Sequence, residues 1–357
     1  MNKRQNLNLF DYINASEMAA YILENPNNKI PYLGETLFPS QKQLGTDISW
    51  LKASNGLPIA IQPSNYDAKA RLREKEGFEG VSTEMAFFRE AMRIGEKDRQ
   101  QLNMLMNHPQ SAIAMPIITK IFNEVSRIVE GVRVQAEIMR MQLLTEGKIN
   151  VTSADGRAQY VYDYQQQNHY YSNSEAEWGT ENGDPVTDIL AWLDDMEIKR
   201  GSRPTKLVMN RNTQIKMLKS GKLHRMMYPD DSARNFYVSD VDKQRFIEQV
   251  CEVKIAIYSK QVAVLNHDTG LQGQAVQLIP DGVICVLPEG KLGNTWYGTT
   301  PEESDLMSGS DAQVQIVNNG TAITTYKEPH PVQVVTVVSA VMIPSFEAIE
   351  DCAIAHV

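Results

Sequence analysis

The sequence predicts an α+β fold, and three observations carry this prediction. The run from Pro116 to Glu146 has the apolar spacing of one long amphipathic helix. Segments with alternating apolar residues flank Asn-Gly and Asp-Gly pairs, which predicts β-hairpins. The C-terminal segments are rich in valine and isoleucine, which favour strands. A chain of 357 residues is long enough to divide these elements between two or three domains.

Composition and charge argue against several classes of protein. The net charge of −9 argues against tight nonspecific binding of nucleic acid, which depends on lysine and arginine. The three cysteines are far apart and odd in number, so we expect no disulfide framework and a reducing compartment. Residues 1–10 lack the apolar core of a signal peptide, and no run reaches the length of a membrane span. We therefore expect a cytoplasmic product with no membrane contact.

The sequence of residues 1–35 is typical of an arm rather than of a domain. Ser16–Glu24 has the pattern of a short helix, with Tyr21 and Ile22 on an apolar side that this helix cannot bury alone. The polar sequence at residues 25–28 ends it. We therefore expect Tyr21 and Ile22 to contact another subunit.

The first hairpin follows the arm. Thr46–Lys52 alternates, Asn55-Gly56 gives a strong turn signal, and residues 57–61 alternate on the return. A two-stranded hairpin is marginal alone in water, so its apolar side should meet another chain or a distant part of this one. The residues that we expect to make this contact are Ile48, Trp50, Asn55, Gly56, Leu57 and Ile59.

A charged stretch comes next. Arg71 and Arg73 alternate with apolar residues among lysines and glutamates. Because the acids cancel much of the field and no aromatic residues interleave, a solvated or intersubunit salt-bridging strand is favoured over a nucleic-acid patch. Ser82–Leu105 then predicts a helix.

The long helix has one apolar and one charged face. Pro116 suits its first turn, Gly147 suits its C-terminal end, and Gly131 is the point at which we expect it to bend. Alternating charges from Arg127 to Arg140 predict a charged face on which neighbouring turns can pair. The apolar stripe consists of Ile118, Ile121, Val125, Ile128, Val132, Ala136, Met139 and Leu143.

The second half predicts a mixed unit and then strands. A second hairpin is expected from residues 148–152 and 159–164, and Asp184-Pro185 marks a domain boundary. Gly221–Asn235 is expected to be a loop that carries Arg225, another candidate for contact between subunits. Further helices are expected at 185–199, 212–219 and 241–251, and strands at 205–209, 254–258, 275–279, 282–287, 322–326, 332–343 and 348–356.

No motif for catalysis or for a cofactor is present. The sequence has no phosphate-binding loop, no dinucleotide fingerprint and no nucleophile elbow, and no histidines or cysteines have metal-ligand spacing. The acid pairs Asp194-Asp195 and Asp230-Asp231 could serve as acid and base or bind magnesium, but adjacent acids on a helix diverge and more often solvate a surface. We therefore expect no catalytic residue, no metal and no cofactor.

The order of segments, together with several short motifs, resembles a known family. Leu37-Phe38-Pro39 precedes the hairpin, Asn55-Gly56-Leu57-Pro58 forms its tip, and the tail has Met342-Ile343-Pro344. The runs from Leu278 to Val283 and from Leu292 to Gly298 match as well. The chain is similar to the major capsid proteins of tailed phages, in particular to the lambda-type major capsid protein E family, whose subunit has the Hong Kong 97 fold.

The resemblance implies four regions. Residues 1–38 would form the N-terminal arm, and 39–82 the extended β-hairpin loop. Residues 83–168 and 322–357 would form the peripheral domain, with 116–146 as its spine helix. Residues 185–321 would form the axial domain.

It also implies a function without catalysis. The protein would assemble into hexamers and pentamers of an icosahedral shell around double-stranded DNA, with only weak nonspecific contact with that DNA. Its partners would be a separate scaffold protein, a maturation protease, a portal and a decoration protein. The shell would be assembled in the host cytoplasm and form the virion capsid. Two alternatives stay open: a bacterial nanocompartment shell of the same fold, and a soluble α/β enzyme.

Overall fold

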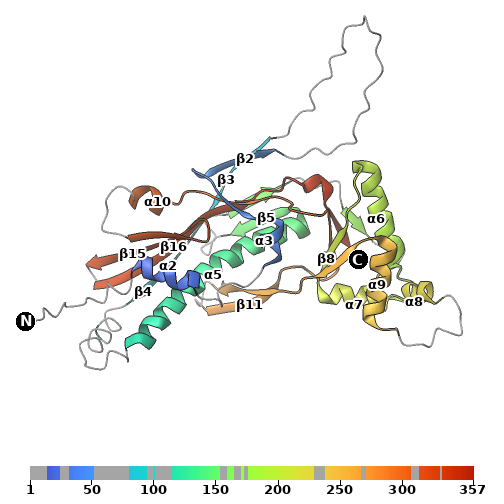
Figure 1. Cartoon of the computed structure of the whole chain (residues 1–357), viewed down its shortest axis with the longest axis horizontal. Helices are drawn as coiled ribbons and strands as arrows, with labels where there is room; N and C mark the ends of the chain where they lie inside the picture. Colours follow the sequence, from blue (N-terminus) through green and yellow to red (C-terminus); the bar gives the residue numbers. More distant parts are fainter. Residues whose placement is uncertain are drawn as a thin grey trace, which may run out of the picture. The chain divides into compact units, whose positions relative to one another are not determined.

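A computed structural model describes most of the chain (Figure 1). The described residues are 14–24, 32–51, 80–94, 100, 114–152, 159–164, 170–172, 176–228, 238–266, 271–306, 313–329 and 332–357. They divide into two compact units. Unit 1 is drawn from Met1–Ile48, Ser82–Ile138 and Asn294–Ser345, and unit 2 from Ser49–Val81, Met139–Gly293 and Phe346–Val357. The predicted α+β class is confirmed.

Unit 1 is organised around one long strand, β16 (Val332–Pro344). Its valine-rich run is buried on both faces, as the sequence predicts. Along one side β16 pairs antiparallel with β15 and β13, and along the other with β4; β14 extends the sheet beyond β15, and β1 pairs parallel with β13. The remaining strands of this sheet are β1 (Ser40–Lys42), β4 (Ala86–Ile94), β13 (Thr295–Tyr297), β14 (Gln313–Val317) and β15 (Thr321–Pro329).

Three short helices of unit 1 have both ends among the described residues. The predicted helix in the arm is confirmed as α2 (Ala15–Glu24), and its apolar side is buried against β14 and β15 of the same chain. Helix α3 (Leu33–Leu37) lies further along the arm. Helix α10 (Pro301–Leu306) begins at a proline, which is favourable in the first turn because the amides there have no partner within the helix. The described residues of the arm therefore contribute to the core of unit 1.

The long helix is confirmed as α5 (Ala114–Glu146). Gly147 follows it with a positive φ of 67°, and its amide donates to Leu143 O at 3.0 Å. The apolar stripe is buried as predicted, except that Val129 replaces the half-buried Ile128. On the charged face Arg133 pairs with Glu130 at 2.9 Å, as the spacing predicts. Glu137 and Arg140, on the same face, are 0% and 1% exposed.

The helix predicted for Ser82–Leu105 is also wrong. Residues 80–94 form two strands, β3 (Gly80–Glu84) and β4. β4 pairs with β16 over nine residues, from Ala86↔Met342 to Ile94↔Val334, and this pairing overrides the local preference. The first strand of the predicted hairpin is present as β2 (Asp47–Leu51), but within the described part of the chain its partner is β3. The predicted return strand, residues 57–61, lies outside the described residues.

Unit 2 contains a mixed five-stranded sheet in the order β7-β17-β12-β8-β9. The central strand β12 is buried at every position. The predicted second hairpin is confirmed as β5 and β6, and β10 and β11 form another two-stranded sheet. The strands are β5 (Lys148–Thr152), β6 (Gln159–Asp163), β7 (Tyr170–Ser172), β8 (Lys206–Met209), β9 (Lys254–Ile257), β10 (Gln261–Asn266), β11 (Leu271–Gln277), β12 (Val283–Leu287) and β17 (Ala353–His356).

The helices of unit 2 follow the predicted pattern with one exception. Helices α6 (Pro185–Arg200), α7 (Arg211–Lys219) and α9 (Asp240–Cys251) are each capped by a side-chain oxygen, from Asp184, Asn210 and Ser239 respectively. Gly221–Met227 forms α8 rather than the predicted loop. The last predicted strand is shorter than expected, since a 3-10 turn, η4 (Ile349–Asp351), precedes β17.

A large apolar cluster of described residues contributes to the core of unit 2. The Trp178 and Trp192 rings stack at 5.8 Å, and the Trp178 indole donates to Asp188 Oδ2 at 2.9 Å. Both rings pack with residues of α6, β8, α9 and β12. The division of the chain into arm, loop, peripheral and axial domains stays a prediction. No helix among the described residues combines the length and apolar character needed to cross a bilayer.

Candidate functional site

The candidate functional contacts are those of the arm with α5, and those of Lys42 and Arg89 with α10. Tyr21 makes the first of these contacts. Its ring lies 5.6 Å from that of Phe122, and its hydroxyl donates to Asn123 Oδ1 at 2.7 Å. Ile22 is 4% exposed. Both residues thus contact their own chain, and their predicted contact with another subunit stays a prediction.

A charged network joins the next part of the arm to α5. The Tyr32 hydroxyl donates to Glu130 Oε1 at 2.8 Å. Arg133 donates to Glu35 Oε1 at 2.8 Å and to Glu130 Oε2 at 2.9 Å, and its guanidinium lies 5.4 Å from the Tyr32 ring centre. The Gly34 amide donates to Glu137 Oε1 at 3.0 Å, at the N-terminal end of α3, where a carboxylate is favourable.

Burial and charge shift two groups in this network. Burial raises the pKa of Tyr32 well above its usual value, and the hydrogen bond to Glu130 adds to this effect. Burial alone would lower the pKa of Arg133, but the hydrogen bond to Glu35 and the charges of Glu130 and Glu35 raise it overall. At moderate pH the network therefore pairs a protonated tyrosine of the arm with Glu130 of α5, and the Arg133 cation of α5 with Glu35 of the arm.

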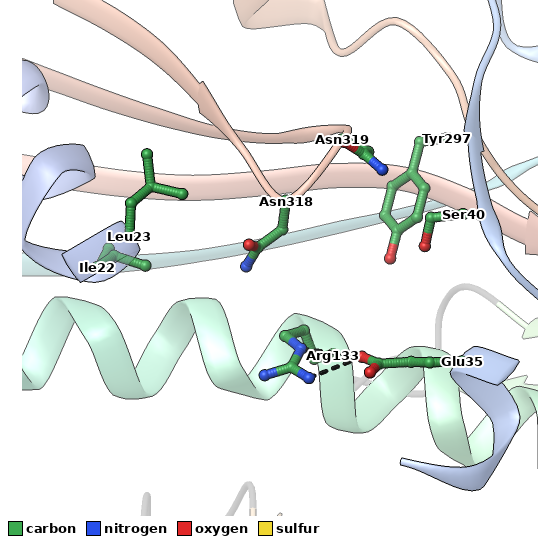
Figure 2. Close-up of a pocket in the computed structure, with 8 residues that line it drawn as sticks. All are labelled: Ile22, Leu23, Glu35, Ser40, Arg133, Tyr297, Asn318 and Asn319. Atoms are coloured by element: carbon green, nitrogen blue, oxygen red, sulfur yellow. Dashed lines mark hydrogen bonds and ion pairs between the residues drawn. The ribbon is translucent and has the colours of Figure 1, made fainter. Parts of the chain in front are cut away.

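A pocket of about 330 Å³ lies beside this network. Figure 2 shows that Ile22 and Leu23 line one end, and that the Arg133–Glu35 ion pair lies along one side. Asn318 and Asn319, in the turn between β14 and β15, have φ values of 49° and 64°, which asparagine tolerates better than most residues. The pocket mixes apolar and amide groups.

Two neighbouring glutamates of α10 hold the two flanks of the predicted extended loop. Lys42, before β2, contacts Glu303 at 2.7 Å and donates to Gly298 O at 3.0 Å. Arg89, after β3, pairs with Glu302, which also accepts from Ser339 Oγ at 2.8 Å. Each glutamate is 9% exposed. The base of the loop is thus fixed by two half-buried ion pairs.

The loop residues themselves are only partly described. Ile48 is 1% exposed, so the apolar side of β2 is covered at this position. Leu44, in the turn before β2, is 87% exposed. Trp50 belongs to β2. The other predicted contact residues of this region, Asn55, Gly56, Leu57, Ile59, Arg71 and Arg73, lie outside the described residues.

The remaining predicted site residue of the second half is Arg225. It lies in α8, and its guanidinium donates to Glu181 O at 2.5 Å. This contact joins α8 to the turn before α6 within unit 2. A contact of Arg225 with another subunit stays a prediction.

The acid pair Asp194-Asp195 does not have the arrangement of a catalytic dyad. Asp194 pairs with Arg203 at 2.5 Å, whereas Asp195 accepts from the Tyr171 hydroxyl at 2.6 Å and from Lys199 at 2.7 Å. The two carboxylates therefore have separate partners on the surface of α6. Asp230-Asp231 lies outside the described residues. Among the residues that the structure describes, no three potential ligands gather as a metal site.

Comparison with known families decides the identity. Residues 14–357 match the family described as phage major capsid protein E. The chain belongs to this family. It is a phage major capsid protein, a structural subunit of the shell of the virion.

Solved structures agree on the fold. A structure assigned to a prophage capsid protein of E. coli CFT073 has a TM-score of 0.56 at 13% identity, covering 97% of this chain and 99% of that one. A phage-related protein from Bordetella bronchiseptica RB50 has a TM-score of 0.50 at 12% identity, covering 95% of each chain. The predicted Hong Kong 97-like capsid fold is confirmed. A search of curated proteins finds no match.

Several residues of these contacts were missed from the sequence of this capsid protein. Glu302 and Glu303 follow Pro301, a pattern typical of a helix start or an acidic loop, which does not indicate their ion pairs. Glu130, Arg133 and Glu137 show alternating charge at helical spacing, which predicts pairing between neighbouring turns of the helix but not contacts with the arm. The partners of these residues lie about 100 or more positions away in sequence, and helical periodicity cannot reveal them.

Proposed function

We propose that this capsid protein assembles as hexamers and pentamers into the icosahedral head of a tailed phage with a double-stranded DNA genome. The observation that carries the proposal is the family match over residues 14–357. A closed symmetric shell multiplies each weak contact by the number of copies, so no single interface has to be strong. The net charge of −9 suits a wall that makes only weak, nonspecific contact with packaged DNA.

The extended loop and the start of the arm supply contacts between subunits in this proposal. β2 and β3 form only a two-stranded sheet within the described residues, which is marginal without a further partner. Its base is fixed by Lys42–Glu303 and by Arg89–Glu302. A loop that is fixed at its base is suited to reach a neighbouring subunit in one direction.

The variant Trp50→Asp tests this role, with Trp50→Phe as its matched control. The protein is expressed with its neighbouring genes, particles are counted by electron microscopy, and circular dichroism monitors the fold. We expect folded subunits and no large particles from Trp50→Asp, and uniform shells from Trp50→Phe. Intact shells from Trp50→Asp would contradict the role of the loop.

A deletion in the arm should stop before residue 14. Removal of residues 1–35 would also remove the buried residues of α2, such as Met18 and Ile22, together with the contacts of Tyr32 and Glu35. Such a variant would lose stability for reasons unrelated to assembly. Deletion of residues 1–13 leaves these contacts in place, and we expect it to reduce the yield of shells without lowering the melting temperature.

The same proposal includes partners and the absence of catalysis. A separate scaffold protein, a maturation protease, a portal and a decoration protein would act on this subunit during assembly in the host cytoplasm. The protein itself would have no enzymatic activity, since the acid pair at Asp194-Asp195 has structural partners. Substitution of both acids by asparagine should therefore leave shell formation unchanged.

A further inference from the structure

Gly131 is the weakest position in helix α5. It is exposed, and a Cβ atom built there would meet no other heavy atom within 4 Å. The absence of a side chain is therefore not required by packing. Glycine in a helix interior costs about 1 kcal/mol relative to alanine and favours bending.

One short segment of the arm contacts α5 on both sides of this glycine. Before Gly131, the Tyr32 hydroxyl binds the carboxylate of Glu130. After Gly131, Glu35 binds Arg133, and the Gly34 amide binds Glu137. All these residues belong to unit 1.

These contacts oppose a bend at Gly131. The helical positions from Glu130 to Glu137 extend over roughly 10 Å along the axis. A bend at Gly131 changes the relative placement of Glu130 and Glu137, whereas Gly34 and Glu35 are held together in the first turn of α3. The segment cannot keep its contacts on both sides of the glycine while the helix bends.

Arg133 makes the two sides interdependent. It bonds to Glu35 on the arm and also to Glu130 on the other side of Gly131, and it lies against the Tyr32 ring. Its side chain is 15% exposed, so these charged contacts are partly shielded from solvent. Loss of any one contact weakens the others.

We propose that Tyr32–Glu35 is a splint that holds α5 straight across Gly131, and that the helix bends there only after this segment has left it. The splint couples the position of the arm to the shape of the long helix. It depends on contacts within one subunit, and it stands whether or not the loop makes the contacts between subunits that we propose above.

The arm also supplies a matched control. Tyr21 donates to Asn123, which lies on the N-terminal side of Gly131 alone. Tyr21→Phe and Tyr32→Phe each remove one hydroxyl that binds α5. Only Tyr32→Phe weakens a contact that belongs to the splint.

Hydrogen exchange of the full chain, followed by mass spectrometry, tests the coupling. We expect Tyr32→Phe to raise exchange in residues 128–138 roughly tenfold, as for loss of a hydrogen bond to a charged group. Addition of Gly131→Ala should cancel most of this increase, because the helix then resists bending without the splint. Tyr21→Phe should raise exchange nearer to Asn123, and Gly131→Ala should leave that increase unchanged.

Two results would overturn the splint. The first is an equal increase from Tyr32→Phe with and without Gly131→Ala. The second is an effect of Tyr21→Phe on residues 128–138 that matches that of Tyr32→Phe. Glu35→Gln, at a side chain that is 35% exposed, repeats the test with little risk to folding if Tyr32→Phe does not yield folded protein.

Discussion

At the scale of single residues, hydrogen bonds of buried polar groups connect segments of this capsid protein that are separated in sequence. Glu137 is completely buried and accepts from the Gly34 amide, and the Asp188 carboxylate accepts from the Trp178 indole. Removal of either acceptor would leave a buried donor unpaired, which costs about 1–3 kcal/mol. These residues therefore matter to stability as much as their apolar neighbours do.

The three cysteines have a different character. Burial raises the pKa of Cys251 to about 11 and of Cys285 to about 12, and it raises the pKa of Cys352 as well. The thiolate is the form that reacts, and all three side chains are buried. We expect a thiol reagent to label none of them in the folded protein from pH 7 to 9 and all three in urea. Labelling of folded protein that increases over this pH range would contradict their burial.

At the scale of elements, the sequence predicts those segments whose pattern is local. Helices α5 and α6 have the apolar period of a helix together with capping or terminating residues, and they were found within two residues of their predicted ends. β4 was missed because its Phe, Glu, Met and Arg residues suit a helix, and only its pairing with β16 makes it a strand. The contacts of the arm and of the loop base join residues 98 to 261 positions apart, beyond the reach of any local pattern.

Helix α5 offers a direct test of intrinsic helix preference. Because nothing surrounds the missing Cβ atom, Gly131→Ala should raise the free energy of unfolding by about 1 kcal/mol. Urea denaturation of the unassembled subunit measures this change. Ser126→Ala, which introduces alanine elsewhere in the same helix, is the comparison that shows whether the effect is specific to replacing the glycine. A loss of stability in Gly131→Ala would mean that the native helix is already bent away from helical geometry at this point.

At the scale of the whole molecule, α10 connects segments that lie far apart in the chain. Its two glutamates bind Lys42, near the start of the predicted extended loop (residues 39–82), and Arg89, after its end. Each cation neutralises a glutamate that is largely shielded from solvent, where an unpaired charge would destabilise the fold. Lys42 and Arg89 are thus held by residues more than two hundred positions further along the sequence.

The Lys42–Glu303 pair should affect the yield of shells. Lys42→Met leaves the Glu303 carboxylate without this cation, and we expect a loss of about 1–3 kcal/mol in the free energy of unfolding and fewer particles by sedimentation. Lys42→Met combined with Glu303→Met should restore much of the free energy of unfolding and of the particle yield, since an apolar pair can replace an ion pair. A double variant that is worse than Lys42→Met would contradict this account.

The central position of β16 governs when a newly made chain can fold. β4 emerges from the ribosome about 240 residues before β16, yet β16 is its partner in the sheet, and the five-stranded sheet likewise awaits β17 at residues 353–356. Contacts between segments so distant in sequence form slowly, because a long loop must close first. Both sheets therefore become complete only after β16 and β17 have been made. A chain cut before β16 lacks the centre of one sheet and a strand of the other, so neither sheet can be completed in it.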